Sequence, residues 1–112
     1  MNVTWEQIGA SMICHLDGNL EHLTVGAFRD AASQIRPNES VIFDLSGVPF
    51  LDSAGLGALI GAVRRVREEG GEAVICAPRR SVNRVLEMVG LPRIVAVASS
   101  VPDALGHLSA VV

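Results

Sequence analysis

Residues 41–60 form the segment that most constrains the fold of this chain. Residues 41–45 are almost continuously apolar, as in a strand that other elements cover on both faces. Gly47 and Pro49 interrupt this run and indicate a turn. A periodic apolar run follows from Ala54 onward. The segment therefore predicts a buried strand, a tight loop and a helix in immediate succession.

Asp52 and Ser53 stand at the predicted start of this helix, and both are residue types that cap helices well. A hydroxyl here lies at the positive end of the helix macrodipole, beside backbone N–H groups that have no partner within the helix. The position favours an anion. A phosphate on Ser53 would add negative charge that this end of the helix can accept without unfolding. The pattern predicts a covalent switch at Ser53.

The predicted helix has two distinct faces. One is a core stripe of large apolar residues: Leu56, Leu59, Ile60, Val63 and Val66. The other is a stripe of small residues: Ala54, Gly57, Ala58 and Gly61. Because glycine costs a helix close to 1 kcal/mol relative to alanine, two glycines need a reason. They indicate either close packing on a neighbouring helix of the same domain or a smooth surface on which a partner approaches Ser53.

Strands and helices alternate along most of the chain. The predicted strands are residues 3–8, 11–16, 41–45, 72–77 and 94–97. The predicted helices have N-caps at Thr24, Ser81 and Ser100 besides the Asp52–Ser53 start, and the first runs to about Arg36.

This alternation predicts crossover connections and a mainly parallel sheet. Residues 9–10 are a short enough link to make the first two strands an antiparallel hairpin. We therefore expect one α/β domain over residues 1–112. Its sheet should be mixed and mainly parallel, with four to five strands and about four helices packed on it.

Composition and charge exclude several classes of function. The net charge of −3 leaves no basic stripe for nucleic acid. Charges and glycines interrupt every apolar run before about 18 residues, too short to span a membrane. The N-terminus lacks the basic and apolar regions of a signal peptide. We expect a cytoplasmic protein that binds neither nucleic acid nor membrane.

The cysteines and histidines do not form a metal-binding pattern. Cys14 and Cys76 both fall in predicted strands, where they are expected to be small buried hydrophobes, although a redox disulfide is an alternative. His15 is expected on the less buried face of its strand, with no partner base at a useful spacing. No cofactor or metal is expected.

Ser53 lacks the surroundings of a catalytic serine. A Gly-x-Ser-x-Gly motif is absent because residue 51 is leucine, and no Gly-Lys-Ser/Thr motif marks a phosphate-binding loop. We expect no enzymatic activity.

The sequence VIFDLSGVPFLDSAGLGAL at residues 41–59 resembles the signature of STAS domains, and specifically of the bacterial anti-sigma factor antagonists. The resemblance continues through VNRVLEMVGL at residues 82–91 and SSVPDAL at residues 99–105. It covers nearly the whole chain, with the motifs in the same order and at the same spacing.

The resemblance implies a function as well as a fold. In that family the unphosphorylated antagonist binds an anti-sigma factor, itself a serine kinase, and thereby frees a sigma factor. The kinase switches the antagonist off by phosphorylating the serine after the aspartate, and a PP2C-type phosphatase resets it. Carried over, Ser53 is the phospho-acceptor, and a small-molecule ligand is not expected. The implied partner-binding residues are Asp52, Ser53, Ala54, Gly55, Gly57, Ala58, Gly61 and Arg84.

The sequence departs from the family pattern at two places. Ala54 stands where many members have a second hydroxyl residue, so Ser53 is the single acceptor at this position. Asn19 and Glu21 stand where the family often has Glu and Asp, so one negative charge is missing from that loop.

Two alternatives remain open. The chain could be the STAS subunit of an ABC-type lipid transport complex, which need not be phosphorylated, or an antagonist gated by oxidation of Cys14 and Cys76.

Overall fold

The structure is a computed structural model and describes residues 1–111. The strands are β1 (Asn2–Ile8), β2 (Ser11–Asp17), β3 (Ser40–Gly47), β4 (Ala73–Cys76) and β5 (Ala96–Ala98). The helices are α1 (Val25–Ala32), α2 (Ser53–Glu68), α3 (Arg80–Met88) and α4 (Val101–Val111), with a 3₁₀ turn, η1, at Leu91–Arg93.

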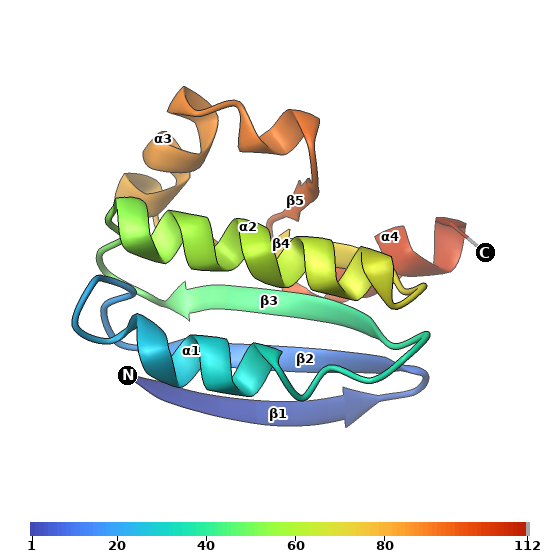
Figure 1. Cartoon of the computed structure of the whole chain (residues 1–112). Coiled ribbons are helices and arrows are strands. Elements are labelled where there is room, and N and C mark those ends of the chain that lie inside the picture. The colour runs from blue at the N-terminus through green and yellow to red at the C-terminus, as the bar shows by residue number, and fades with distance from the viewer. Residues whose placement is uncertain (112) are drawn as a thin grey trace.

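The five strands form one sheet in the order β1-β2-β3-β4-β5 (Figure 1). β1 and β2 are antiparallel, whereas β2, β3, β4 and β5 are parallel to one another. This confirms the predicted α/β domain with a mixed, mainly parallel sheet and an antiparallel hairpin at its N-terminal side. The strand at residues 41–45 lies in the middle of the sheet, as its apolar sequence predicts.

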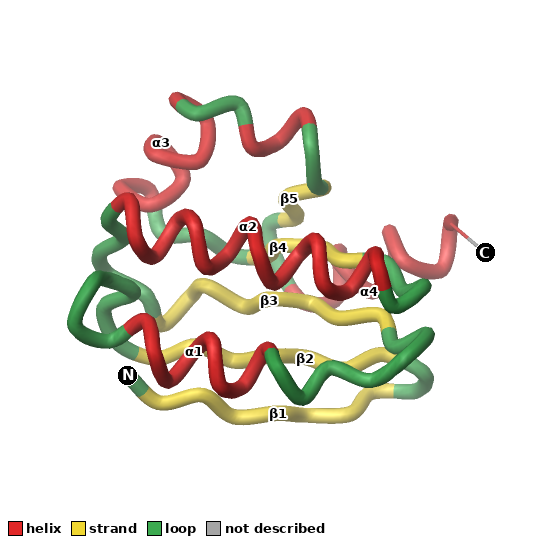
Figure 2. The backbone as a smooth tube through the Cα atoms, viewed as in Figure 1, coloured by secondary structure: helices red, strands yellow, loops and turns green. Residues whose placement is uncertain are grey.

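Helices cover both faces of the sheet (Figures 1 and 2). The larger core cluster joins α1, α2 and α3 to one face, with Phe28 of α1 packed edge-to-face on Phe43 of β3 at 5.9 Å between ring centroids. A smaller cluster joins Ala104 and Leu108 of α4 to Ile42 and neighbouring residues on the opposite face. We call this second face the α4 face. β3 therefore buries side chains on both sides.

α1 is one turn shorter than predicted, because it ends at Ala32 and not at about Arg36. Arg65 of α2 donates hydrogen bonds to the carbonyl oxygens of Ser33 and Ile35, at 3.1 and 3.3 Å. These bonds satisfy carbonyl oxygens that lie past the end of the helix, and Pro37 has no N–H that could bond Ser33 O in a further helical turn. Thr24 occupies the predicted N-cap position without a capping bond, since its hydroxyl donates to Asn19 O at 2.6 Å.

The predicted boundaries of α3 and β5 also need correction. α3 begins at Arg80, so Ser81 lies inside the first turn and is not the N-cap. Ile94 is not in a strand, because its N–H bonds to Leu91 O at 2.8 Å and continues the η1 turn. The capping bond at Ser100 is confirmed, since its Oγ accepts from Asp103 N at 3.2 Å.

The two cysteines cannot form a disulfide in this fold. Cys14 lies on β2 in the larger core cluster, whereas Cys76 lies on β4 in the cluster on the α4 face. β3 separates the two strands, and two strand spacings of about 4.8 Å exceed the reach of a disulfide, about 7 Å between Cα atoms. Both thiols are free and buried. The redox-gated alternative is therefore wrong for the folded protein.

Within residues 1–111, no helix is both long enough and apolar enough to cross a membrane.

Candidate functional site

The candidate site lies at the carboxyl edge of the parallel strands, where the loops after β2 and β3 meet (Figure 2). Backbone hydrogen bonds join the two loops: Leu20 N donates to Phe50 O at 3.0 Å, and Asp52 N donates to Leu20 O at 3.3 Å. Leu20 also forms a parallel bridge with Leu51. The chain that enters α2 is therefore held between neighbouring loops before the helix begins.

Asp52 caps α2 and also binds the neighbouring loop. Its Oδ1 accepts from Gly55 N at 2.8 Å, and its Oδ2 accepts from His22 N at 3.0 Å. The hydrogen bond from Gly55, followed by that from His22, holds the pKa of Asp52 below its ordinary value. Asp52 is thus an ionised residue that fixes the start of α2, and with it Ser53, by bonding both to the helix at Gly55 and to the neighbouring loop at His22.

Ser53 is the first residue of α2 and is exposed. It lies at the positive end of a 16-residue helix, where the first-turn N–H groups favour negative charge. The geometry is that of an accessible hydroxyl on a rigid support. This is the position that the sequence predicts.

The four residues of the predicted small stripe, and Gly55 beside them, occupy different environments. Gly55 and Ala58 are buried, Ala54 is half-buried, and Gly57 and Gly61 are exposed. Gly55 is required by the fold, because a Cβ there would overlap the carbonyl group of Leu20. A Cβ at Gly57 or Gly61 would meet no atom within 4 Å. Close internal packing therefore accounts for Gly55 and Ala58, but not for Gly57 and Gly61.

Gly57 and Gly61 instead line a shallow groove of about 260 Å³ between α1 and α2. Arg29 of α1 and Arg65 of α2 also line it. The groove runs along α2, the helix that begins with Ser53. One element of a partner protein can therefore lie in the groove and also reach Ser53.

α3 borders the same edge. The Ser81 hydroxyl donates to Pro49 O at 3.5 Å, and Arg79 Nε donates to Ser46 O at 2.9 Å. Arg84 is exposed on α3. The structure thus brings the start of α3 against the loop that leads to Ser53, and Arg84 follows one turn later.

Two exposed apolar side chains in these loops were not predicted as functional. Leu23 is 86 % exposed and Phe50 is 50 % exposed, and they lie in the two loops that Asp52 joins. Apolar side chains that gather at the surface within a polar rim mark protein interfaces, and these two belong to loops that hydrogen bonds join. The available signal was a phenylalanine within a turn, between Pro49 and Leu51.

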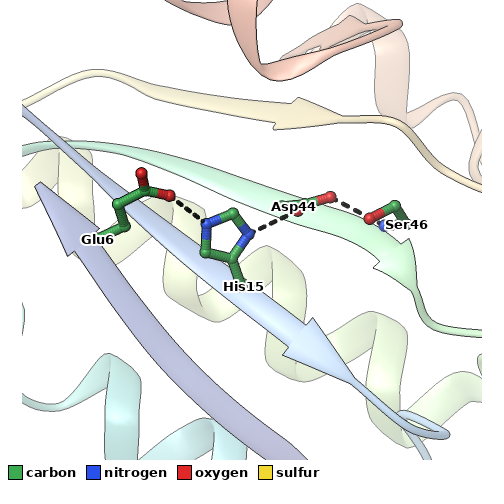
Figure 3. A network of polar contacts seen from close by, with 4 residues as sticks. All are labelled: Glu6, His15, Asp44 and Ser46. Carbon is green, nitrogen blue, oxygen red and sulfur yellow. Dashed lines mark hydrogen bonds and ion pairs between the residues drawn. The ribbon is translucent and has the colours of Figure 1, made fainter. Parts of the chain in front are cut away.

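His15 has partners that sequence reasoning missed. Its Nδ1 lies 2.6 Å from Asp44 Oδ2, and its Nε2 lies 2.8 Å from Glu6 Oε1 (Figure 3). The expectation that no partner lies near His15 is wrong, because strand pairing brings residues 9 and 29 positions away beside it. The hydrogen bond to Glu6 raises the pKa of His15, and the contact with Asp44 raises it further.

Asp44 is the one buried charged residue among those described. Burial by itself raises its pKa, but hydrogen bonds from Ser46 and His15 outweigh burial, so the pKa of Asp44 lies below its ordinary value. Within the described part of the chain, no group of three or more His, Cys, Asp or Glu side chains could hold a metal ion.

Comparison with known proteins places the chain in a family. The model of the STAS domain matches residues 2–104. An anti-sigma F factor antagonist from Paenibacillus polymyxa is 32% identical over 114 residues, which cover 99% of this chain and 97% of the relative.

Solved structures share the fold. The anti-sigma factor antagonist SpoIIAA in its unphosphorylated form has a TM-score of 0.75 and 19% identity, covering 99% of both chains. The murine Solute Carrier 26 family member A9 anion transporter has a TM-score of 0.79 and 21% identity, covering 94% of this chain and 18% of that one. At these identities the two structures support the fold alone, whereas the family rests on the match over residues 2–104 and on the 32% identical relative. This chain belongs to the STAS domain family.

Proposed function

We propose that the protein is an anti-sigma factor antagonist controlled by phosphorylation of Ser53. In its unphosphorylated state it binds an anti-sigma factor that is also a serine kinase, and so frees a sigma factor in the cytoplasm. The kinase phosphorylates Ser53, the complex dissociates, and a PP2C-type phosphatase restores the free hydroxyl. The protein itself is a substrate and a binding partner, not an enzyme.

The observation that carries this proposal is the setting of Ser53. Ser53 is exposed and begins a long helix, and Asp52 just before it is held by hydrogen bonds from Gly55 of the helix and from His22 of the neighbouring loop. A kinase needs an accessible hydroxyl, and a switch needs a position where added charge reaches the partner surface. The full-length similarity to a relative named as an anti-sigma F factor antagonist supports the same function.

The proposed partner surface centres on Ser53. In this surface the exposed side chains of Leu23 and Phe50 make apolar contacts with the partner. The groove beside Gly57 and Gly61 receives part of the partner. Asp52, Ala54 and Arg84 lie at its margin. Gly55 and Ala58 are buried, so they act through the packing of α2 and not by touching the partner.

The switch works through charge at this surface. A phosphate adds about −1.5 to −2 charge, and here it would be placed beside the Asp52 carboxylate. The helix N-terminus tolerates this charge in the free protein, but a docked partner would have to desolvate it against Leu23 and Phe50. We therefore expect phosphorylation to weaken binding without refolding the domain. Widespread backbone amide shift changes in phosphorylated protein would contradict this local mechanism.

The test is incubation with each serine-kinase anti-sigma factor of the host and ATP, followed by intact-mass measurement and peptide mapping. We expect one added phosphate, on Ser53, and none in Ser53→Ala. Ser46→Ala is the matched control, because Ser46 is also exposed at this edge of the sheet, and this variant should be phosphorylated normally.

Absence of phosphate on Ser53 with every host kinase would refute the proposed switch. Capture of a permease or an ATPase subunit in place of an anti-sigma factor would favour the transport-complex alternative. Binding of an anti-sigma factor that is equal for wild type and Ser53→Asp would leave the partner correct and the switch wrong.

A further inference from the structure

Glu6, His15 and Asp44 form a side-chain bridge across three neighbouring strands on the α4 face (Figure 3). Glu6 belongs to the edge strand β1, His15 to β2 and Asp44 to β3. His15 shares its face with Ile13, two residues earlier, which packs in the cluster below α4. The bridge therefore adds a side-chain connection between the edge strand and the middle of the sheet.

Both contacts of His15 are hydrogen bonds only when both ring nitrogens carry hydrogen. Nδ1 lies 2.6 Å from a carboxylate oxygen of Asp44, and Nε2 lies 2.8 Å from one of Glu6. Carboxylates accept hydrogen bonds, whereas neutral imidazole has a single N–H. The geometry is therefore that of the imidazolium ion. When His15 loses a proton, one nitrogen turns a lone pair toward a carboxylate oxygen, and that contact becomes repulsive.

The contact with Glu6 is the one that breaks. The Asp44 side chain is only 12% exposed, whereas that of Glu6 is 54% exposed. Depriving a buried carboxylate of a donor costs more than returning an exposed one to water. Neutral His15 therefore keeps its N–H on Asp44, and Glu6 moves into solvent.

We propose that this bridge is a proton-operated clamp on β1: protonated His15 ties the edge strand to β3, and deprotonation releases Glu6 and loosens β1. The ionisable groups that face His15 are Glu6 from β1 and Asp44 from β3, and these are the groups that shift its pKa. On the far side of Asp44, β4 presents Cys76 in register, a buried thiol whose pKa burial raises to about 12, so it stays neutral over the pH range of the clamp. The proposal does not depend on phosphorylation of Ser53.

The direction of the effect follows from the charges. Below the ordinary pKa of histidine, about 6.5, the clamp is fully formed as long as the two carboxylates stay ionised. It opens as the pH rises through the higher pKa that His15 has in the folded protein. β1 should therefore be held more tightly at mildly acidic pH than at alkaline pH.

The test is amide hydrogen exchange of the whole chain at about pH 6 and about pH 9, corrected for the intrinsic exchange rate. In wild type, we expect the opening of β1 amides to rise about twofold to fivefold at the higher pH, the scale of a single partly exposed ion pair. The amides of β4 are the internal reference and should change less.

Glu6→Gln is the main variant, because Glu6 is exposed and its removal should not prevent folding. It should lower the titration midpoint of the His15 ring in NMR spectra and abolish the pH dependence of β1. His15→Gln should also remove the pH dependence. His107→Gln, an exposed histidine on α4, is the matched control and should behave as wild type.

Three results would overturn the clamp. One is a ring ¹⁵N spectrum that shows a single protonated nitrogen on His15 at about pH 6. The second is an equal rise of exchange in β1 and β4, which would indicate global unfolding. The third is a pH dependence of β1 that survives in Glu6→Gln. Trp5, the single tryptophan, lies on β1, so its fluorescence gives an independent record of this strand.

Discussion

Asp52 and Ser53 have different roles at the start of α2. Asp52 uses both carboxylate oxygens within the protein, on Gly55 N and His22 N, whereas Ser53 is left accessible. The aspartate is therefore the structural member of the pair, and the exposed serine is the one that we propose a partner phosphorylates. The capping role suits a half-buried side chain and the other role needs an exposed one. Asp52 is half-buried and Ser53 is exposed, although the two residues are adjacent.

Replacing Asp52 tests this division. Asp52→Ala removes both acceptors, so it should lower the denaturation midpoint, and Asp52→Asn, which keeps one acceptor oxygen, should fall between the alanine variant and wild type. Because the folded pKa of Asp52 is depressed, its contribution is present above the unfolded pKa and lost as the pH falls through the folded value. Urea titration at neutral and acidic pH measures the denaturation midpoints of the variants and the pH dependence of the Asp52 contribution. Equal midpoints for Asp52→Ala and wild type at neutral pH would contradict the capping role.

His15 contributes to stability with the opposite pH dependence. Its folded pKa is raised, so its contribution is fully present below about 6.5 and lost as the pH rises through the folded value. Since the side chain is 32% exposed, the effect should be below about 1 kcal/mol. Urea titrations should show wild type losing this increment between mildly acidic and alkaline pH. The stability of His15→Gln should not decrease in this way over the same pH range. An equal decrease in His15→Gln would show that a group other than His15 causes it.

At the scale of elements, α2 carries glycines with opposite roles. Gly55 faces the backbone of Leu20, where a side chain does not fit, whereas Gly57 faces open space in the groove beside α1. A helix of this length does not need Gly57 for folding. Its presence is consistent with a surface kept free of side chains for a partner.

A matched pair of alanine substitutions separates these roles. Gly57→Ala should stabilise the protein by about 0.8–1.0 kcal/mol, the difference in helix propensity. Gly55→Ala gains the same propensity but should destabilise, because the new Cβ would overlap the Leu20 carbonyl. Thermal unfolding measures both. If the groove receives the partner, Gly57→Ala should weaken binding of the anti-sigma factor despite its higher stability, and unchanged binding would remove the groove from the partner surface.

At the scale of the whole molecule, the sheet separates its two thiols. Cys14 and Cys76 are buried on opposite faces, and burial, helped by the Asp44 carboxylate, raises the pKa of each thiol to about 12. The folded protein should therefore react slowly with thiol reagents and form no internal disulfide. Alkylation in native buffer and in urea measures this. Rapid native labelling, or a disulfide formed without unfolding, would contradict the separation.

Local patterns determined most of the architecture. The apolar run at residues 41–45 predicted the central strand, and the alternation of helices and strands predicted the parallel sheet. Asp52 and Ser53 predicted the start of α2, because a capping bond joins residues within three positions of one another and is therefore visible in the local sequence. These features need no knowledge of distant contacts.

Only the tertiary structure decided the features that depend on contacts between distant segments. The donor to the carbonyls that follow α1 is Arg65, about 30 residues away, and the need for Gly55 follows from Leu20. The partners of His15 come from β1 and β3, and strand pairing places them there. The sequence by itself thus determined the elements and the position of Ser53. Folding decided which loops hold Ser53, which small residues are exposed and which charges meet His15, because these are properties of residues brought together from different parts of the chain.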